Sequence, residues 1–137
     1  MTENPFYWDA NIWLDIYEKR GYANEVATQL LKKIIIIDGV IFYSDLVVDE
    51  LKKVGYSQYE INQILSIAKP DHLKRVHIYK KQIDEAREVA RRQDVPEADA
   101  LHAILARDNQ FTLVSRDQKD FPRLRYIWPV KLPEELI

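Results

Sequence analysis

The amino-acid sequence predicts an α/β fold, a three-layer α/β/α sandwich with a mainly parallel central sheet. Short apolar segments rich in β-branched and aromatic residues alternate along the chain with segments of helical period. This alternation favours a parallel sheet with helices on both of its faces. The length of 137 residues, 47% of them hydrophobic, supplies one sizeable core rather than two. No internal repeat, low-complexity tract or linker stands out, so we expect a single domain over residues 1–137.

The first predicted strand is "FYWD", which runs into Asp9. A helix over residues 10–20 should follow and stop at Gly21, because glycine commonly occupies the position after a helix end. A second helix should begin near Tyr22 or Asn24 and carry "EVATQLLKK". This region therefore contributes one strand and two helices to the sandwich.

The segment "IIIIDGVIFY" fits two structures. Asp38 and Gly39 between two β-branched runs are typical of a β-hairpin. The same residues also fit a helix end, a turn at Asp38 and Gly39, and one strand, "VIFY". We favour the second interpretation because the apolar pattern of "VATQLLKKII" still follows a helical period.

The middle of the chain carries clear helix boundaries. Ser44 is the predicted N-cap of the helix "DLVVDELKKV", which ends at Gly55. "SQYE", which begins at Ser57, is a capping box and opens a helix that reaches about residue 68. Pro70 prevents this helix from continuing.

The later part of the chain continues the alternation. "LKRVHIY" is a predicted short strand, and a charged helix over residues 80–93 follows it. Pro96 suits the start of the next helix, over residues 97–107, because a missing N–H costs nothing there. "FTLVS" is a strand, "RDQKDF" is a loop, and "YIWPV" is the last predicted strand, closed by Pro129 or soon after.

Composition excludes several classes of site. The chain has no cysteine, so disulfides and thiolate metal sites are excluded, and a reducing compartment fits. No apolar run approaches the roughly 20 residues of a membrane span. The N-terminal "MTENPFYW" is unlike a signal peptide. We therefore expect a cytoplasmic protein that does not use a membrane.

The charge balance argues against a protein that coats duplex nucleic acid, since the net charge is −2 and the pI is about 5.9. It does not exclude a nuclease, because carboxylates that hold a metal also lower the net charge. Positive charge gathers in two stretches, which we interpret first as solvated faces. The basic residues are Lys80, Lys81, Arg87, Arg91 and Arg92 in one stretch, and Arg116, Lys119, Arg123 and Arg125 in the other.

Two acids, Asp9 and Asp117, stand at the ends of predicted strands, and Ser115 stands beside the second. In parallel α/β sheets, ligands bind outside the carboxyl ends of the strands. Each acid also has an ordinary structural explanation. Asp9 fits the N-cap of a helix, and Asp117 fits an Asx-turn in a loop.

Two further acids lie on helix faces that should be dry. Glu50 falls inside the apolar arc of its helix, one turn from both Leu46 and Val54, where a charge is costly unless it is paired or bound to metal. At the rim of that arc it would instead reach water. Asp99 lies on the alanine side of "ADALHAILA", a helix that we expect to be enclosed on both sides. Its alternative explanation is the favourable electrostatics of a helix N-terminus.

Convergence of these acids on one edge of the sheet would require a cation, because carboxylates repel one another. Oxygen ligands, without cysteine and without a histidine pair of metal-ligand spacing, suit Mg²⁺ or Mn²⁺. His72 and His77 are interpreted as surface or strand residues. His102 lies one turn from Asp99, and we expect it either to pack or to form a hydrogen bond near the predicted site.

Four segments together resemble the PIN-domain family of metal-dependent ribonucleases: "YWDANIW", "SDLVVDEL", "VPEADALHAILA" and "LVSRDQKDF". Their order and spacing agree over essentially the whole chain. The third segment, an acid inside Asp-Ala-Leu-His with alanines behind it, is the most specific of the four. The compact size also resembles the single-domain VapC-type toxins of toxin–antitoxin pairs, which commonly dimerise and are blocked by a partner antitoxin.

The resemblance implies a site of four catalytic acids that hold the metal: Asp9, Glu50, Asp99 and Asp117. Asn11 and Ser115 would support them with hydrogen bonds. Some relatives carry Asn at the position of Asp117 and an acid three residues later, where this chain has Asp120. We favour Asp117 as the fourth acid because it lies closer to the strand end.

The predicted function is a Mg²⁺- or Mn²⁺-dependent endoribonuclease. Metal in such a site lowers the pKa of a bound water, which attacks the phosphorus in line. Single-stranded RNA is the expected substrate, since the grooves of a duplex do not easily deliver a bond into a narrow acidic pocket. Arg116, Lys119 and either Arg91 or Arg92 would hold flanking phosphates. The resemblance further implies a toxin with an antitoxin partner, acting as a homodimer.

Three other interpretations stay open at this point. A catalytically silent PIN-like module would bind only RNA or a protein partner, although none of the acids is missing. A receiver-like signalling domain is also doubly wound and acidic, but here Asp9 is accompanied by Asn11 rather than by a second acid. An enzyme of RNA maturation or decay would work without an antitoxin.

Overall fold

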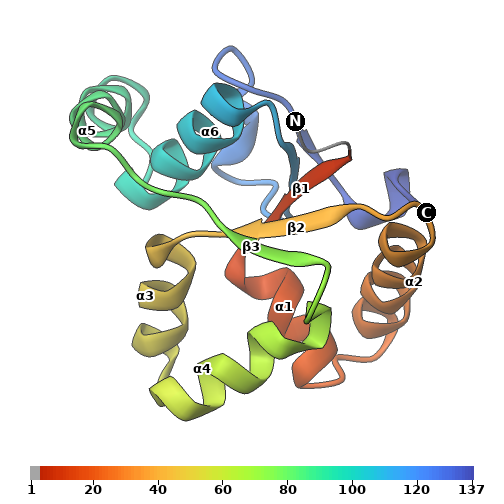
Figure 1. Ribbon diagram of the computed structural model, residues 1–137. Helices are drawn as coiled ribbons and strands as arrows, with labels where there is room; N and C mark the ends of the chain where they lie inside the picture. Colours follow the sequence, from red (N-terminus) through yellow and green to blue (C-terminus); the bar gives the residue numbers. More distant parts are fainter. Residues whose placement is uncertain (1–3) are drawn as a thin grey trace.

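A five-stranded sheet with all strands parallel crosses the centre of the computed structural model, which describes residues 4–137 (Figure 1). The strand order is β3-β2-β1-β4-β5. The strands are β1 (Pro5–Trp8), β2 (Val40–Tyr43), β3 (Leu73–Arg75), β4 (Thr112–Val114) and β5 (Val130–Lys131). The predicted α/β sandwich with a parallel central sheet is confirmed.

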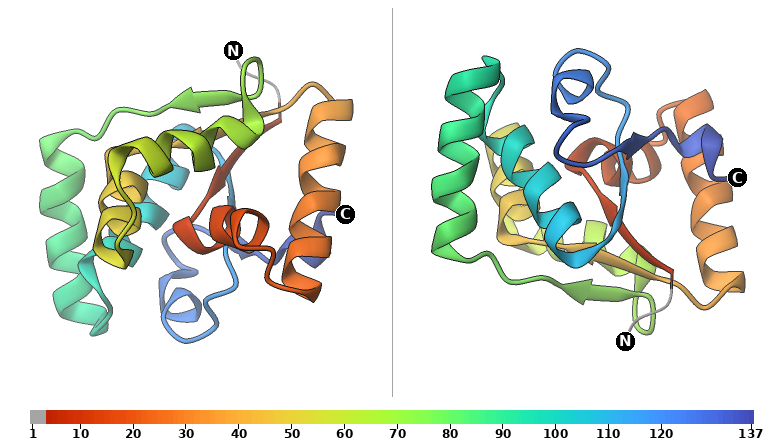
Figure 2. Two further views of the ribbon diagram at one scale, coloured as in Figure 1. Left: turned by 90° about the horizontal axis from the view of Figure 1, so that it is seen from below. Right: turned by 90° about the horizontal axis from the view of Figure 1, so that it is seen from above.

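Helices cover both faces of this sheet. In Figure 1, α1, α3 and α4 lie below the strands with α2 packed beside α1, whereas α5 and α6 lie above, and Figure 2 presents the two faces in turn. The helices are α1 (Ala10–Tyr17), α2 (Tyr22–Ile36), α3 (Asp45–Val54), α4 (Gln58–Leu65), α5 (Lys80–Gln93) and α6 (Glu97–Asn109). Short 3₁₀ helices are η1 (Ser66–Ala68), η2 (Phe121–Leu124) and η3 (Pro133–Glu135). Within this described part, no helix has both the length and the apolar character that a membrane crossing requires.

The strand order places β1 and β4 side by side, although the chain leaves them in opposite directions. From β1 it passes through α1 and α2 to β2, and from β4 it passes through η2 to β5 on the other side of the sheet. Such a reversal opens a crevice at the carboxyl ends of the two neighbouring strands, where ligands bind in α/β sheets. Asp9 and Ser115 directly follow these two strands.

Local signals account for several boundaries. "VIFY" is β2, and the isoleucines before it belong to the end of α2, so the helix, turn and strand interpretation is confirmed over the hairpin. Asp38 has a left-handed φ of 55° in the turn, and a Cβ atom at Gly39 would lie 3.0 Å from the carbonyl oxygen of Asn4. Ser57 and Glu60 make both hydrogen bonds of the predicted capping box.

The boundary between the first two helices differs from the prediction. Helix α1 ends at Tyr17 rather than near residue 20, and Lys19 takes the left-handed conformation with φ of 53°. Gly21, with φ of 59°, is the N-cap of α2 and not the residue that follows α1. The predicted glycine stop was therefore wrong by one turn, because a lysine adopts the strained conformation instead.

The last strand also differs from the prediction. The last strand is β5, and Val130 is the only residue of the predicted segment "YIWPV" that belongs to it. The backbone N–H groups of Ile127 and Trp128 both donate to the carbonyl oxygen of Leu124, in a turn that follows η2. These groups are used within the turn, so they cannot pair with β4.

The core surrounds β1 on both faces. Tyr7 and Trp8 are completely buried, and every residue from 100 to 106 in α6 is buried. Helix α6 packs against α5, β4 and η2. The prediction that this helix is enclosed on both sides is therefore confirmed.

Candidate metal centre

Asp9 uses its two carboxylate oxygens differently. Oδ1 accepts a hydrogen bond from the backbone N–H of Ile12 (3.2 Å) and thereby caps α1. Oδ2 accepts a hydrogen bond from the hydroxyl of Ser115, the residue that follows β4. The ordinary explanation of Asp9 as a helix cap is thus correct, and the cap coexists with a link to the neighbouring strand end.

The loop after β4 folds around Asp117. Its Oδ1 accepts hydrogen bonds from the backbone N–H groups of Lys119 (2.8 Å) and Asp120 (3.1 Å), the pattern of an Asx-turn. Its own N–H donates to Oγ of Ser115 (3.0 Å). Ser115 therefore links Asp9 and Asp117 at one corner of the sheet.

Asp99, in the first turn of α6, meets this loop. One carboxylate oxygen from each of Asp99, Asp117 and Asp120 lies within 4.8 Å of the others, and we name these three residues the acidic cluster. Asp117 and Asp120, between which the sequence left a choice, both belong to it. All three side chains are partly buried.

Glu50 connects to the site through His102 of α6. Oε1 of Glu50 lies 2.7 Å from Nε2 of His102, whose side chain is 1% exposed against 29% for Glu50. The negative charges of Glu50, Asp9 and Asp99 all act on this imidazole. The apolar arc of α3 is narrower than predicted, because Val54 is 61% exposed, and Glu50 lies at its rim.

Burial and mutual repulsion disfavour the charged forms of two acids. Burial, reinforced by the negative charge of Asp117, raises the pKa of Asp99 to about 7. Burial also raises the pKa of Asp9 to about 6, although the hydrogen bond from Ser115 opposes it. The pKa of His102 moves up as well, because the hydrogen bond and charge of Glu50 outweigh the opposing effect of burial.

Basic side chains do not neutralise this group of acids. In residues 4–137, no Arg or Lys forms an ion pair with Asp9, Asp99 or Asp117. Close, partly buried carboxylates without a cation are costly to keep charged. Oxygen donors of this kind match the preference of Mg²⁺ and Mn²⁺, so the residues present fit a hard divalent cation.

Two polar hollows adjoin the acids. One of about 330 Å³ includes Asp9 and Asp117 in its wall, and the other, of about 520 Å³, includes Asp120. The first is lined further by Asn11, Asp15, Arg20 and Arg116, and the second by Asp94, Val95, Pro96, Lys119 and Arg123. The acids therefore stand between two hollows that each carry basic side chains.

The basic residues predicted to hold phosphates differ in where they lie and in whether they already form ion pairs. Lys119 lines the larger hollow. Arg116 is engaged in ion pairs with Glu134 (2.9 Å) and with Asp15 (3.4 Å). Arg91 and Arg92 lie on the exposed side of α5, and both pair with Glu88, a residue outside the acidic cluster.

Two contacts of this region have no counterpart in the predicted site. Asn11 accepts a hydrogen bond from Arg20 (3.3 Å), and among residues 4–137 its carboxamide makes no hydrogen bond with the acids that it was expected to support. Asp15 is 4% exposed and lies between Arg20 and Arg116. The criterion that singled out Glu50, an acid on the apolar face of a helix, would also have found Asp15.

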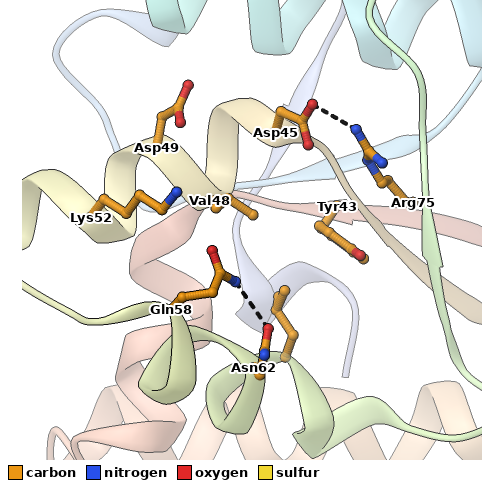
Figure 3. A pocket seen from close by; sticks show the side chains of 9 residues that line it. Tyr43, Asp45, Val48, Asp49, Lys52, Gln58, Asn62 and Arg75 are labelled. Carbon is orange, nitrogen blue, oxygen red and sulfur yellow. Dashed lines mark hydrogen bonds and ion pairs between the residues drawn. The ribbon is translucent and has the colours of Figure 1, made fainter.

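A separate hollow of about 460 Å³ lies between α3, α4 and the strands β2 and β3 (Figure 3). Asp45 pairs with Arg75 across it (2.7 Å), and Gln58 donates to Asn62 (3.0 Å). It contains none of the clustered acids, so the chemistry of the donors assigns the candidate centre to the crevice between β1 and β4 instead.

Comparison with known proteins agrees with the fold. The sequence model of the PIN domain family matches residues 6–125. A search of curated proteins gives no match. Among solved structures, the chain is similar to VapBC2 from Rickettsia felis bound to a promoter DNA fragment, with a TM-score of 0.64 and 20% identity over 93% of this chain and 96% of that one. A toxin–antitoxin complex from Klebsiella pneumoniae gives 0.59 and 21% over 85% and 89%, and FitAB bound to the IR36 DNA fragment gives 0.62 and 15% over 93% and 94%.

Proposed function

The chain belongs to the PIN-domain family, and on that premise we propose that it is a Mg²⁺- or Mn²⁺-dependent endoribonuclease that hydrolyses phosphodiester bonds in single-stranded RNA. One observation carries the proposal. The carboxylates of Asp99, Asp117 and Asp120 gather within 4.8 Å, and the ion pairs found in residues 4–137 include none between them and a basic side chain. Such a group lowers its own energy by taking up a divalent cation.

The proposed catalytic acids are the four implied by the resemblance: Asp9, Glu50, Asp99 and Asp117. A bound divalent cation supplies Lewis-acid polarisation of the phosphate and a more acidic water. The Asp9 carboxylate is held by the hydroxyl of Ser115, and the Asp117 carboxylate is held by the backbone N–H groups of Lys119 and Asp120. Both carboxylates would therefore need little reorganisation to accept a cation. Burial raises the pKa of Asp99 to about 7, which favours its protonated form below that pH, and a bound cation would favour the carboxylate instead.

Hydrolysis forms a bond between a water oxygen and phosphorus and breaks the bond from phosphorus to the leaving oxygen of the RNA. The two hollows beside the acids suit the nucleotides on either side of this bond. Lys119 would hold a phosphate in the larger hollow, and Arg123, which lines the same hollow, would assist it. Arg116 would contribute only after loosening its ion pair with Glu134, and Arg91 and Arg92 would contact more distant phosphates.

We extend the proposal to the toxin of a toxin–antitoxin pair. The similar solved structures include VapBC2, FitAB and a toxin–antitoxin complex, and the likeness in fold covers 85–93% of this chain. A protein antitoxin would then be the natural partner, and the active form would be a cytoplasmic homodimer of this single-domain chain. Light scattering of the purified chain, alone and after co-expression with a candidate antitoxin, tests these partners.

The activity is tested with single-stranded RNA in buffer that contains either Mg²⁺, Mn²⁺ or EDTA. Asp99→Asn should abolish metal-dependent cleavage, whereas Asp49→Asn should preserve it, because Asp49 lines the separate hollow of Figure 3. A folded wild-type chain that binds RNA but cleaves none with either metal would favour the catalytically silent module instead.

A further inference from the structure

A path of hydrogen-bonded polar side chains runs through the core towards Glu50. Oγ of Ser44 lies 2.7 Å from the hydroxyl of Tyr7, and this hydroxyl lies 2.8 Å from Nδ1 of His102. Nε2 of the same imidazole lies 2.7 Å from Oε1 of Glu50. Ser44, Tyr7 and His102 are each at most 1% exposed, whereas the Glu50 side chain is 29% exposed. The path therefore begins in the dry interior and ends at the partly exposed carboxylate of Glu50, which is not itself one of the three residues of the acidic cluster.

Four separate parts of the fold contribute to this hydrogen-bonded path. Tyr7 belongs to β1, Ser44 follows β2, and His102 and Glu50 project from α6 and α3. Tyr7 and His102 are 95 positions apart in the sequence, and their rings also make an edge-to-face contact at 5.3 Å between centroids. One hydrogen-bonded path thus connects β1, the end of β2, α6 and α3.

Ser44 belongs to this path and does not cap its helix through its side chain. It is the N-cap residue of α3, but its side chain makes no capping hydrogen bond to the helix. A serine at this position ordinarily accepts a hydrogen bond from a free N–H of the first turn. Here the hydroxyl pairs with Tyr7 instead, so the path is kept at the expense of a helix cap.

The proton positions follow from the outer end. A charged Glu50 carboxylate can only accept, so Nε2 of His102 must donate to it. In the neutral imidazole Nδ1 is then an acceptor, and it takes the hydrogen bond of the Tyr7 hydroxyl. That hydroxyl in turn accepts from Ser44. With the imidazole neutral, each polar group of the path is satisfied with one consistent direction of donation.

We propose that Ser44, Tyr7 and His102 act as positioning residues that fix the carboxylate of Glu50 for a divalent cation. Hydrogen bonds behind a ligand orient it and raise its affinity for the metal, and their loss typically lowers that affinity about 10- to 100-fold. Oε1 of Glu50 is committed to His102, which leaves Oε2 outside the hydrogen-bonded path as the oxygen for the cation. This inference rests on the proposed function, because it assumes that Glu50 is a metal ligand.

The test is a calorimetric Mn²⁺ titration of the full chain and its variants in alkaline buffer. His102→Leu removes the donor to Glu50 and should raise the Kd for Mn²⁺ about 10- to 100-fold. His102→Gln keeps an N–H donor at a similar reach and should recover part of that loss. Tyr7→Phe removes only the hydroxyl and should raise the Kd several-fold. Tyr17→Phe, which changes a tyrosine outside the path, is the matched control and should leave the Kd unchanged.

The outcomes separate this inference from the proposed function. A wild-type chain that binds Mn²⁺ and cleaves RNA, together with a folded Tyr7→Phe and a folded His102→Leu of unchanged Kd, overturns the positioning role and leaves the nuclease intact. Should His102→Leu fail to fold, the nearly isosteric Tyr7→Phe decides alone. A wild-type chain that neither binds Mn²⁺ nor cleaves RNA overturns both. A raised Kd in Tyr7→Phe with an unchanged unfolding midpoint supports positioning over a merely structural role.

Discussion

Carboxylates gather in two regions of this molecule, and their surroundings differ in one respect. At the seam between α5 and α6, Glu85 accepts two hydrogen bonds from Arg107 (2.8 and 2.7 Å), and Asp108 accepts one from Arg107 and one from Gln82 (both 2.9 Å). The hydrogen bond from Arg107 lowers the pKa of Glu85, and that of Asp108 is also lowered despite burial. In the acidic cluster, burial raises the pKa of Asp99 to about 7.

The difference lies in the partners and not in the residue type. Acids at the seam are held by an arginine, so their charged forms stabilise the fold. The charged form of Asp99 has Asp117 and Asp120 as neighbours, so it opposes the fold. A cluster that works against stability in this way is typical of a functional site. The contrast shows that the acidic cluster, unlike the seam, has no basic partner among the described residues, which supports the proposal that it takes up a cation.

The largest expected effect is on RNA cleavage. Asp117→Asn should lower the rate at least about 100-fold, because a metal ligand supports several kcal/mol of charge stabilisation in the transition state. Asp108→Asn, the matched change at the seam, should alter the rate less than about twofold, the effect usual for a residue away from the reacting groups. Single-turnover cleavage of a labelled single strand measures both. Equal losses in the two variants would remove the distinction between the regions.

The next effect is on stability at the seam. Arg107→Ala leaves Glu85 and Asp108 without their guanidinium and should lower the free energy of unfolding by about 1–2 kcal/mol, given its partial exposure. Arg87→Ala, at a more exposed pair with Glu97, is the control and should change it by at most about 0.5 kcal/mol. Urea unfolding followed by circular dichroism gives both values, and an unaffected Arg107→Ala would contradict the structural role of the seam.

A substitution in the acidic cluster is expected to raise the free energy of unfolding, by a smaller amount than the loss at the seam. Asp99 binds its proton more tightly in the folded chain than in the unfolded one, since its pKa rises from 3.8 to about 7. The folded state thus loses stability as pH rises through this window, and the loss is complete above about pH 7. Asp99→Asn does not titrate, so without metal it should be more stable than the wild type by about 1 kcal/mol in alkaline buffer, after allowance for partial exposure.

The pH series supplies the control for this sign. The advantage of Asp99→Asn should shrink as the pH falls towards the ordinary pKa of the carboxyl group, because the wild-type carboxyl is then protonated in both states. Chemical unfolding in EDTA at several pH values follows the difference. A variant less stable than the wild type across the whole series would mean that Asp99 stabilises the fold when charged, as the acids of the seam do.

The smallest effect is expected on the exposed face of α5. Glu88→Gln removes a carboxylate that pairs with Arg91 and Arg92 in solvent, and such pairs contribute little to stability. The unfolding midpoint should not change measurably, and Mn²⁺ affinity should also stay the same. A clear shift in either quantity would show that this outer face is coupled to one of the two regions.

Local signals predict most of the fold, since turn residues and apolar periods act over a few positions. Helix α5 spans residues 80–93 as predicted, and the capping box at Ser57 is present. The bounds of the two-residue strand β5 were wrong because they are defined by pairing with β4, which is not adjacent in the sequence. Gly21 was misassigned because glycine serves at either end of a helix, and only the chain path distinguishes the two.

The candidate site also has some residues that local sequence signals predict and others that depend on contacts between distant segments. Strand ends and helix faces single out Asp9, Glu50, Asp99 and Asp117, and the topological reversal brings the ends of β1 and β4 together. Their role as metal ligands stays a prediction. Two other features join residues from different elements, so no local sequence pattern predicts them. These are the path through Tyr7 and His102 and the ion pair of Arg116 with Glu134. Side-chain hydrogen bonds of this kind become visible only in three dimensions.

The central claim is that the acidic cluster is held for a divalent cation, and thermal unfolding of the wild-type chain with increasing Mg²⁺ tests it most directly. A ligand that binds only the folded state raises its stability progressively with concentration. The account predicts that Tm in alkaline buffer rises with Mg²⁺ in the wild type, and that this rise disappears in the double variant Asp99→Asn, Asp117→Asn. A wild-type Tm that is the same in EDTA and in millimolar Mg²⁺ or Mn²⁺, or an equal rise in the double variant, would contradict it.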